Sequence, residues 1–185
     1  MEWAGSIPGT VGGAVCTNAG AFNAAFWDYV RYVDVVAAGG SIMRLGPKDV
    51  IHSYRKTQFP IPKPFAVTEV GLELERSDPG AVASLAASYK LRREASQPLG
   101  VASAGCVFKN PPGDEPAGAL IEKAGLKGAR RGSAVVSEKH ANFIVNEGGA
   151  SAAEIYELIG FVRDQVRQQF GVELETEIEY LGAFR

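Results

Sequence analysis

The sequence predicts an α+β fold for this chain of 185 residues. Residues 30–37 are rich in valine and have strand character. Gly39 and Gly40 then turn the chain into a second run at residues 41–45, which is the pattern of a β-hairpin. Residues 151–171 instead repeat apolar side chains at helical spacing. Helices that alternate with antiparallel hairpins indicate the α+β class.

A further strand is expected at residues 65–75, because successive side chains there fall into two alternating sets, one for each face of a strand. The alternation places Phe65 and Val67 on one face, and Thr68 and Val70 on the other.

Residues 79–95 predict a helix whose apolar side chains share one face and whose basic side chains gather near its end. Residues 97–102 have the composition of a linker. We therefore predict two domains, residues 1–95 and residues 96–185. The apolar face of the helix comprises Val82, Leu85, Ala86 and Tyr89.

The second half begins with an extended segment, residues 105–110, which ends at two prolines. A short helix is marked by Pro116 in its first turn and by Gly125 past its end. Strands are expected at residues 135–136 and 142–146, where apolar residues cluster.

The last helix carries the clearest signals in the chain. Ser151 and Glu154 have the spacing of a capping box, and Gly171 supplies the C-terminal cap. Residues 172–180 then alternate strictly and predict a half-buried strand with a row of glutamates on one face. The apolar face of this helix comprises Ile155, Leu158, Ile159, Val162, Val166 and Phe170.

Composition excludes several classes of function. The formal net charge of −2 gives no electrostatic case for nucleic acid or an anionic membrane. No apolar run approaches the roughly 20 residues that span a bilayer, and the start of the chain does not have the pattern of a secretory signal. Cys16 and Cys106 have no CxxC spacing, which favours a reducing, cytoplasmic setting. Two histidines without a ligand pattern argue against a metal site.

The glycine-rich segment at residues 5–24 suggests close approach of the backbone to another group. Glycine leaves N–H groups unshielded, which suits a cofactor or a phosphate. The spacing matches neither G-x-G-x-x-G nor G-x-x-x-x-G-K-[ST]. A tight structural crossover is an equally good interpretation of the composition.

Three single residues could carry chemistry. Arg55 can bind a carboxylate or phosphate with two parallel hydrogen bonds, although most surface arginines do not. Cys106 is either a small buried hydrophobe or a proton donor, because a thiol with a pKa of about 8.5 is protonated at neutral pH. If its segment is extended, Cys106 shares a face with Phe108 and Asn110. Glu177 lies among similar glutamates, and spacing alone does not single it out.

Several ordered blocks, which cover nearly the whole chain, together resemble the UDP-N-acetylenolpyruvoylglucosamine reductase family. The short gap between Arg55 and the block that contains Cys106 is similar to the second type of this family, which lacks an extra substrate-covering loop. The blocks are Ile-Pro-Gly-Thr-Val-Gly-Gly-Ala at 7–14, Asn-Ala-Gly-Ala-Phe at 18–22, Tyr54-Arg55, Ala-Gly-Cys-Val-Phe-Lys-Asn-Pro at 104–111, Ala-Gly-Ala-Leu-Ile-Glu-Lys-Ala-Gly-Leu-Lys-Gly at 117–128, Lys-His-Ala-Asn-Phe-Ile-Val-Asn at 139–146 and Leu-Glu-Thr-Glu-Ile-Glu at 174–179.

The resemblance implies a fold and a reaction. Residues 1–95 would be the remainder of a vanillyl-alcohol-oxidase-type FAD-binding domain, and residues 96–185 a small α+β substrate-binding domain. The family uses FAD, with NADPH as electron donor, to reduce the enolpyruvyl ether of a UDP-sugar to UDP-N-acetylmuramate for peptidoglycan. Members normally have a further segment before this point, with a glycine-rich loop for the FAD pyrophosphate. We therefore expect this chain to be an incomplete form that binds FAD weakly or not at all by itself.

The resemblance also implies site residues by position. Arg55 would bind and polarise the substrate carboxylate, Cys106 would replace the serine that protonates carbon, and Glu177 would complete the catalytic site. Tyr54 and Asn110 would contact the substrate. No metal is implied. The positions similar to the part that packs against the flavin are Pro8, Gly9, Gly12, Gly13, Asn18, Ala19 and Gly20.

Two positions depart from the family pattern, and two other functions stay open. Asn23 stands where the family often has glycine, and Thr57 replaces the usual serine after the arginine. One alternative is a UDP-sugar-binding remnant without catalysis, which cofactor binding would distinguish. The other is a different FAD enzyme, which the blocks of the second half disfavour.

Overall fold

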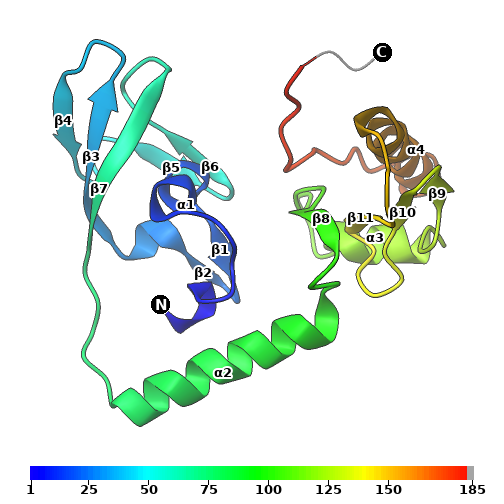
Figure 1. The fold of residues 1–185 in the computed structure, drawn as a ribbon, viewed down its shortest axis with the longest axis horizontal. Coiled ribbons are helices and arrows are strands. Elements are labelled where there is room, and N and C mark those ends of the chain that lie inside the picture. The colour runs from blue at the N-terminus through cyan, green and yellow to red at the C-terminus, as the bar shows by residue number, and fades with distance from the viewer. Residues whose placement is uncertain (183–185) are drawn as a thin grey trace. The chain divides into compact units, whose positions relative to one another are not determined.

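The chain forms two structural units, Met1–Arg93 and Glu94–Arg185, each built around its own apolar core. The computed structural model describes residues 1–182 (Figure 1). The assignment of residues 1–95 and 96–185 as functional domains stays a prediction, and the last three residues of the second lie outside the described range.

A three-stranded antiparallel sheet, in the order β4-β3-β7, forms the first unit's framework. It consists of β3 (Val30–Ala37), β4 (Ile42–Leu45) and β7 (Phe65–Leu72). The predicted hairpin is confirmed, and Gly40 takes a φ of +81° in its turn. Val33 and Val35 of β3 are fully buried, since the central strand has a partner on each side.

Strand β7 departs from the predicted alternation and ends at Leu72, three residues early. Asp34 and Val35 are neighbours on β3 but pair with β7 residues that lie two apart, so Thr68 is an extra residue. Such a β-bulge reverses which face the following side chains occupy. Val70 therefore packs against the core together with Phe65 and Val67, contrary to the simple alternation.

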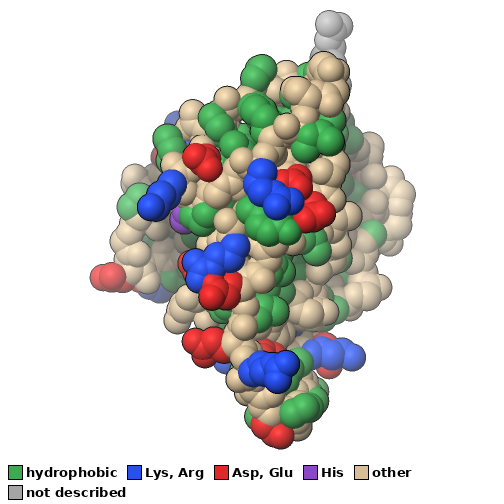
Figure 2. All heavy atoms as spheres, turned by 90° about the vertical axis from the view of Figure 1, so that its left-hand side faces the viewer, with side chains coloured by type: hydrophobic (Ala, Val, Ile, Leu, Met, Phe, Trp, Pro, Cys, Tyr) green, Lys and Arg blue, Asp and Glu red, His purple; other side chains and the backbone are tan. Residues whose placement is uncertain are grey.

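The outer face of this sheet is charged and its charges are paired. Figure 2 shows basic and acidic side chains next to one another on this side of the molecule. Arg44 donates from Nε and Nη2 to the two carboxylate oxygens of Asp34, both at 2.7 Å, and these bonds lower the pKa of that carboxyl. The ring of Tyr32 lies beneath the same guanidinium and over Gly71, where a Cβ would overlap the ring.

A short helix, α1 (Val11–Thr17), lies in the glycine-rich segment, where the sequence analysis did not predict one. Gly12 and Gly13 lower helix propensity and hide the signal. The helix begins after Thr10, whose hydroxyl accepts a hydrogen bond from the Gly13 N–H at 3.1 Å. The other short elements of this unit are the 3₁₀ turns η1 (Glu2–Ala4) and η2 (Phe26–Asp28), and the strand pairs β1 (Gly20–Ala21) with β2 (Ala24–Ala25) and β5 (Ile51–Ser53) with β6 (Lys56–Gln58).

Helix α2 (Pro79–Ser96) confirms the predicted helix, but its apolar face is mostly exposed. Val82 and Leu85 keep 36% and 43% of their surface accessible. Tyr89 does reach the core, and its ring packs at a tilt against that of Phe22, with ring centroids 4.5 Å apart. Among the described residues, no helix has the length and apolarity that a membrane crossing requires.

The second unit pairs an antiparallel sheet, in the order β8-β11-β10-β9, with two helices. Helix α4 confirms its predicted caps: the Ser151 hydroxyl accepts from the Glu154 N–H at 3.2 Å, the Glu154 carboxylate accepts from the Ser151 N–H, and Gly171 has a φ of +71°. Its residues Leu158, Ile159, Val162 and Val166 are buried, whereas Phe170 is exposed. The elements are β8 (Ala102–Cys106), α3 (Ala117–Lys123), β9 (Arg130–Arg131), β10 (Ala134–Val136), β11 (Phe143–Asn146) and α4 (Ala152–Phe170).

The strand predicted at residues 172–180 is wrong in its extent. Only a single bridge forms there, between Thr176 and Phe108. The alternation of residue types is real, since Leu174 is buried and Glu173 and Glu175 are exposed. The partner segment, however, stops at the two prolines after Asn110, so a longer ladder has no edge to pair with.

Candidate functional site

The start of the glycine-rich segment presents a surface of small residues. Pro8 and Gly9 are exposed, and Gly9 has a φ of +139° that favours glycine. A Cβ on Gly9 would meet nothing within 4 Å, so the space beside it is open. Gly12 is different, because a Cβ there would contact Val67 of β7 at 3.4 Å, which brings α1 close to the sheet.

The end of the same segment is tied into the fold. Asn18 caps α1 in a left-handed conformation and is 5% exposed. Its Nδ2 donates to the Ser53 carbonyl at 2.9 Å, and its Oδ1 accepts from the Trp27 N–H at 3.1 Å. The N–H of Ala19 donates to the carbonyl of Ala14 at 2.8 Å. A flavin contact by Asn18 and Ala19 stays a prediction, while their role in linking α1 to the β5–β6 hairpin is visible.

Arg55 lies in the turn between β5 and β6 and is oriented by the glycine-rich segment. Its φ of +53° is uncommon for a residue with a large side chain. Its Nη2 donates to the carbonyl of Gly20 at 2.8 Å, and the guanidinium lies over the Tyr54 ring at 4.9 Å. A Cβ on Gly20 would sit 2.5 Å from the Ala24 carbonyl and 3.2 Å from Arg55 Nη1. Glycine at position 20 therefore makes room for the guanidinium, and the left-handed turn aims it.

Asn23 lies in a tight turn whose backbone conformation also suits glycine. Phe22 and Asn23, which connect β1 to β2, have φ values of +53° and +64°. Positive φ at both central positions is typical of a type I′ hairpin, and asparagine tolerates it well. The replacement at Asn23 is thus compatible with the local backbone.

Thr57 and Trp27 hold the Arg55 hairpin against α1. The Thr57 hydroxyl donates to the Val15 carbonyl at 2.7 Å and accepts from the Trp27 Nε1–H at 2.9 Å. His52, on the other strand of the hairpin, stacks on the Trp27 ring at 5.2 Å. A hydroxyl at position 57 serves this junction whether it comes from threonine or serine.

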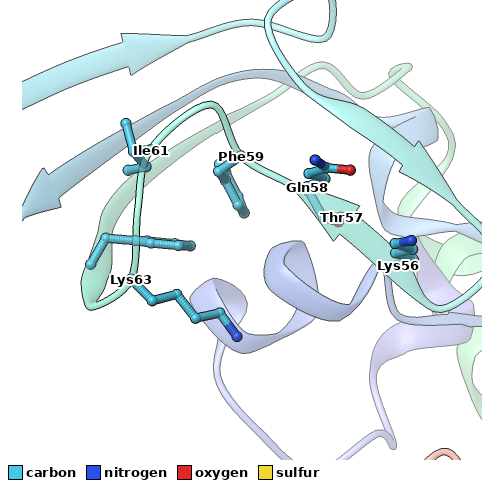
Figure 3. A pocket seen from close by; sticks show the side chains of 7 residues that line it. Lys56, Thr57, Gln58, Phe59, Ile61 and Lys63 are labelled. Atoms are coloured by element: carbon cyan, nitrogen blue, oxygen red, sulfur yellow. The ribbon is translucent and has the colours of Figure 1, made fainter.

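A half-open hollow of about 410 Å³ is lined by β6 of this hairpin and by the residues that follow it in the sequence (Figure 3). In Figure 3 the Lys63 side chain extends towards a helix of this unit, and the Phe59 ring points into the space. The nearby Cys16 thiol has its pKa raised by burial, an effect that the charge of Lys63 opposes. The lining residues are Lys56, Thr57, Gln58, Phe59, Ile61, Lys63 and Phe65.

In the second unit, a β-bulge precedes Cys106. Cys106 pairs with Phe143 of β11, whereas Ser103 pairs with Val145, so β8 carries an extra residue. Gly105 has a φ of +82°, and a Cβ there would meet nothing within 4 Å. Conformation rather than space therefore favours glycine. Bulges of this kind redirect the side chains that follow them, and here the half-buried Cys106 follows.

Glu177 lies on the segment that pairs with the residues just after Cys106. Its N–H donates to the Val107 carbonyl at 2.7 Å, and the Lys109 N–H donates to the Glu175 carbonyl at 2.9 Å. Glu177 is half-buried, whereas the side chains of Glu173, Glu175 and Glu179 are exposed. The tertiary structure thus singles out Glu177 among four glutamates, which spacing alone did not do.

Burial after Cys106 does not follow a single face. Val107 and Phe108 are both buried, at 3% and 2% exposed, because the segment has packing partners on both sides. Asn110 is exposed, and its Oδ1 accepts from the Ala117 N–H at the start of α3 at 3.1 Å. A substrate contact by Asn110 stays a prediction. The structure adds a residue that sequence reasoning missed, Asn142, which hydrogen-bonds the backbone of Phe108.

The predicted site residues thus fall into two groups. The first unit brings Arg55 and Tyr54 together with Gly20. The second unit brings the segments of Cys106 and Glu177 together. Joint action of the two groups stays a prediction.

Comparison with known proteins identifies the family. Residues 97–181 match the family model for the C-terminal domain of UDP-N-acetylenolpyruvoylglucosamine reductase, and residues 1–46 match an FAD binding domain. A protein named UDP-N-acetylenolpyruvoylglucosamine reductase from Alkalilimnicola ehrlichii is 46% identical over 98% of this chain and 60% of its own length. The one from Desulfosudis oleivorans is 43% identical, with the same coverages.

This chain belongs to the UDP-N-acetylenolpyruvoylglucosamine reductase family. A crystal structure of the reductase from Thermus caldophilus matches it with a TM-score of 0.82 and 38% identity, over 96% of this chain and 62% of that one. The chain spans about 60% of the length of the curated relatives it matches. The predicted fold class is confirmed, with part of an FAD-binding domain followed by the reductase's C-terminal domain.

Proposed function

We propose that this chain takes part in the FAD-dependent, NADPH-driven reduction of the enolpyruvyl ether of UDP-N-acetylglucosamine to UDP-N-acetylmuramate. The reaction would serve peptidoglycan precursor synthesis in the cytoplasm, with a UDP-sugar as the small-molecule partner. Family membership supports the reaction class. The observation that carries the site is the half-buried Glu177. Its N–H donates to the Val107 carbonyl, in the strip of residues 107–109 that follows Cys106.

The residues at the start of the chain fit a flat cofactor. Pro8, Gly9 and Gly13 are exposed, and no atom would meet a Cβ on Gly9 within 4 Å. A surface whose exposed residues are mostly small permits close approach by a ring system. FAD bound there would accept the hydride of NADPH and supply it to the substrate. Pro8, Gly9, Gly12 and Gly13 would hold it, with Asn18, Ala19 and Gly20 supporting the same segment.

Arg55 would bind the substrate carboxylate. A hydride that reaches one vinyl carbon moves negative charge onto the neighbouring carbon and its carboxylate. A guanidinium held in place before the reaction stabilises that charge as it develops. The bond from Nη2 to Gly20 and the left-handed turn provide this preorganisation. Tyr54, beside the guanidinium, would contact the substrate.

Cys106 would complete the reduction by giving its thiol proton to that neighbouring carbon. One hydride and one proton then add across the double bond, and the thiolate regains a proton from solvent. A thiol is more acidic than an alcohol, so cysteine replaces the family's serine without losing the donor role. Glu177 would orient the assembly, and Asn110 would contact the UDP-sugar.

Cofactor titration tests this proposal directly. The 185-residue chain is mixed with FAD, and its visible spectrum is recorded before and after NADPH and the enolpyruvyl UDP-sugar are added. Because the chain is expected to bind FAD weakly by itself, FAD is added in excess, and flavin absorbance that NADPH bleaches and the substrate restores is the expected result. Binding of the UDP-sugar without any flavin would favour the non-catalytic remnant instead. Arg55→Lys is the matched variant, because a point charge does not reproduce the planar fork and should weaken substrate reduction.

A further inference from the structure

Asn142 lies where the regular pairing between β8 and β11 ends. Its backbone carbonyl accepts from the Val107 N–H at 2.8 Å. Its side chain then takes over: Oδ1 accepts from the Phe108 N–H at 2.9 Å, and Nδ2 donates to the Phe108 carbonyl at 2.8 Å. One carboxamide thus satisfies both backbone groups of Phe108, as the peptide unit of a neighbouring strand would. Asn142 is 4% exposed and Phe108 is 2% exposed, so water does not compete for these bonds.

The opposite edge of the same strip carries Glu177. The Val107 carbonyl accepts from the Glu177 N–H, and the Lys109 N–H donates to the backbone carbonyl of Glu175. Residues 107–109 are therefore held on one edge by Asn142 and on the other by residues 175–177. Cys106 immediately precedes this strip, so the same bonds fix the position of the Cys106 backbone, which carries the thiol, relative to the backbone of Glu177.

We propose that Asn142 is a positioning residue, which holds the strip after Cys106 so that the Cys106 thiol and the Glu177 carboxyl keep one fixed relation. The inference rests on the proposed function for the roles of those two groups. A carboxamide suits this task because it donates and accepts at the same time. An ionised carboxylate only accepts, and its second oxygen would face the Phe108 carbonyl.

This chemistry makes Asn142→Asp a variant that pH can switch. A neutral carboxyl can donate to the Phe108 carbonyl while its other oxygen accepts from the Phe108 N–H. Burial among backbone groups should raise the pKa of the new carboxyl and widen the range in which it is neutral. We expect the variant to resemble the wild type at low pH and to lose the strip geometry once the carboxyl ionises.

The first readout is the rate at which iodoacetamide alkylates Cys106, relative to Cys16 in the first unit, between pH 5 and pH 9. In Asn142→Asp this ratio should equal that of the wild type at low pH and rise by roughly ten-fold at high pH, the size expected when one buried hydrogen bond is lost. Asn142→Ser, which keeps a hydroxyl for one of the two groups, should give an intermediate rise at every pH. It also serves if the aspartate variant does not fold at high pH.

Asn146→Asp is the matched control. Asn146 lies on the same strand, and its Oδ1 accepts from the N–H groups of Gly148 and Ala150 at 2.9 and 3.0 Å, but its strand partner is Ala102 at the other end of β8. It should leave the Cys106 ratio unchanged. An equal rise in the control, or a ratio in Asn142→Asp that follows the wild type at every pH, would overturn the proposal.

A second readout separates this inference from the proposed function. In the FAD-loaded protein, Asn142→Asp should lower kcat for the enolpyruvyl substrate roughly ten-fold at high pH, again the effect of one buried hydrogen bond, and leave flavin reduction by NADPH unchanged. If the FAD-loaded protein turns over no enolpyruvyl substrate, the proposed function fails while the alkylation result still decides the geometry. If Cys106→Ala keeps full turnover, only the donor role of Cys106 fails. If Cys106→Ala abolishes turnover but Asn142→Asp changes neither readout, the positioning role alone fails.

Discussion

Gly20→Ala should destabilise the first unit, because residue 20 has no room for a side chain. A new Cβ would lie 2.5 Å from the Ala24 carbonyl oxygen and 3.3 Å from the Ala25 Cα. Both atoms belong to the backbone of β2, so neither can move aside by changing a rotamer. Overpacking of this kind typically costs about 1–3 kcal/mol. In a domain of this size each kcal/mol lowers Tm by about 4–8 °C.

The same substitution should also displace Arg55. The new Cβ would lie 3.2 Å from Nη1, and the Gly20 carbonyl that holds Nη2 would shift with its residue. The loss of substrate affinity should therefore exceed what the loss of stability explains. A bidentate contact depends on the direction of the fork as well as on its charge.

Urea unfolding followed by tryptophan fluorescence is a suitable assay. The chain's two tryptophans, Trp3 and Trp27, both lie in the first unit and are each 3% exposed, so their emission reports this unit. Gly39→Ala is the control, because a Cβ there meets nothing within 4 Å, and surface changes of this kind stay within about 0.5 kcal/mol. Equal unfolding midpoints for the two variants would refute the argument about space at Gly20.

Three further predictions follow from other parts of the structure. Cys106→Ala should abolish turnover of the enolpyruvyl substrate but leave flavin reduction by NADPH intact, and Cys106→Ser should keep substantial activity; stopped-flow absorbance of the two half-reactions checks this, and a parallel loss of both would remove the donor role. The pKa of His140 is lowered by burial, so its NMR titration midpoint should fall below the ordinary value of 6.5. Because the unfolded chain then binds the proton more readily than the folded chain, the contribution of His140 to stability should be present above about pH 6.5 and lost as the pH falls below it. A titration midpoint above 6.5 would contradict this direction. Gly71→Ala should destabilise the sheet because its Cβ would overlap the Tyr32 ring, and Tyr32→Ala in the same chain should relieve most of that loss; additive losses of unfolding free energy in the double variant would show that the two residues do not interact.

The elements that the sequence predicts well are those whose signals are local. Helix α4 has its capping box at Ser151, its apolar stripe and its terminal Gly171 within one stretch, and the structure has the same bounds. The β3–β4 hairpin likewise needs only valine-rich runs and two glycines. These signals depend on neighbouring residues, so no tertiary contact is needed to interpret them.

The missed elements depend on contacts between distant residues. Helix α1 contains Gly12 and Gly13, which lower helix propensity, and packs against β7; Thr10 before the run was the available signal. The tail around Thr176 alternates like a strand, but its length is limited by a partner segment that ends near Asn110. The alternation in β7 fails because a bulge at Thr68 cannot be seen without its partner strand.

The candidate site shows the same division. Family motifs pick out Arg55 and Cys106 by their neighbours along the chain, but their local geometry comes from Gly20 and from the bulge at Gly105. Glu177 is distinguished from three similar glutamates only by partial burial. Asn142 had no signal as a single residue, because its role arises from two hydrogen bonds to a segment 34 positions away.

The most direct test of the account is the arrangement of the reacting groups in a crystal of the FAD-loaded protein with the enolpyruvyl UDP-sugar bound. We predict that the substrate carboxylate lies about 2.7–2.9 Å from the Arg55 guanidinium. The carbon beside that carboxylate should lie next to the Cys106 sulfur, with Glu177 lining the same site. A substrate held by other residues, with Arg55 and Cys106 both out of its reach, would contradict the account.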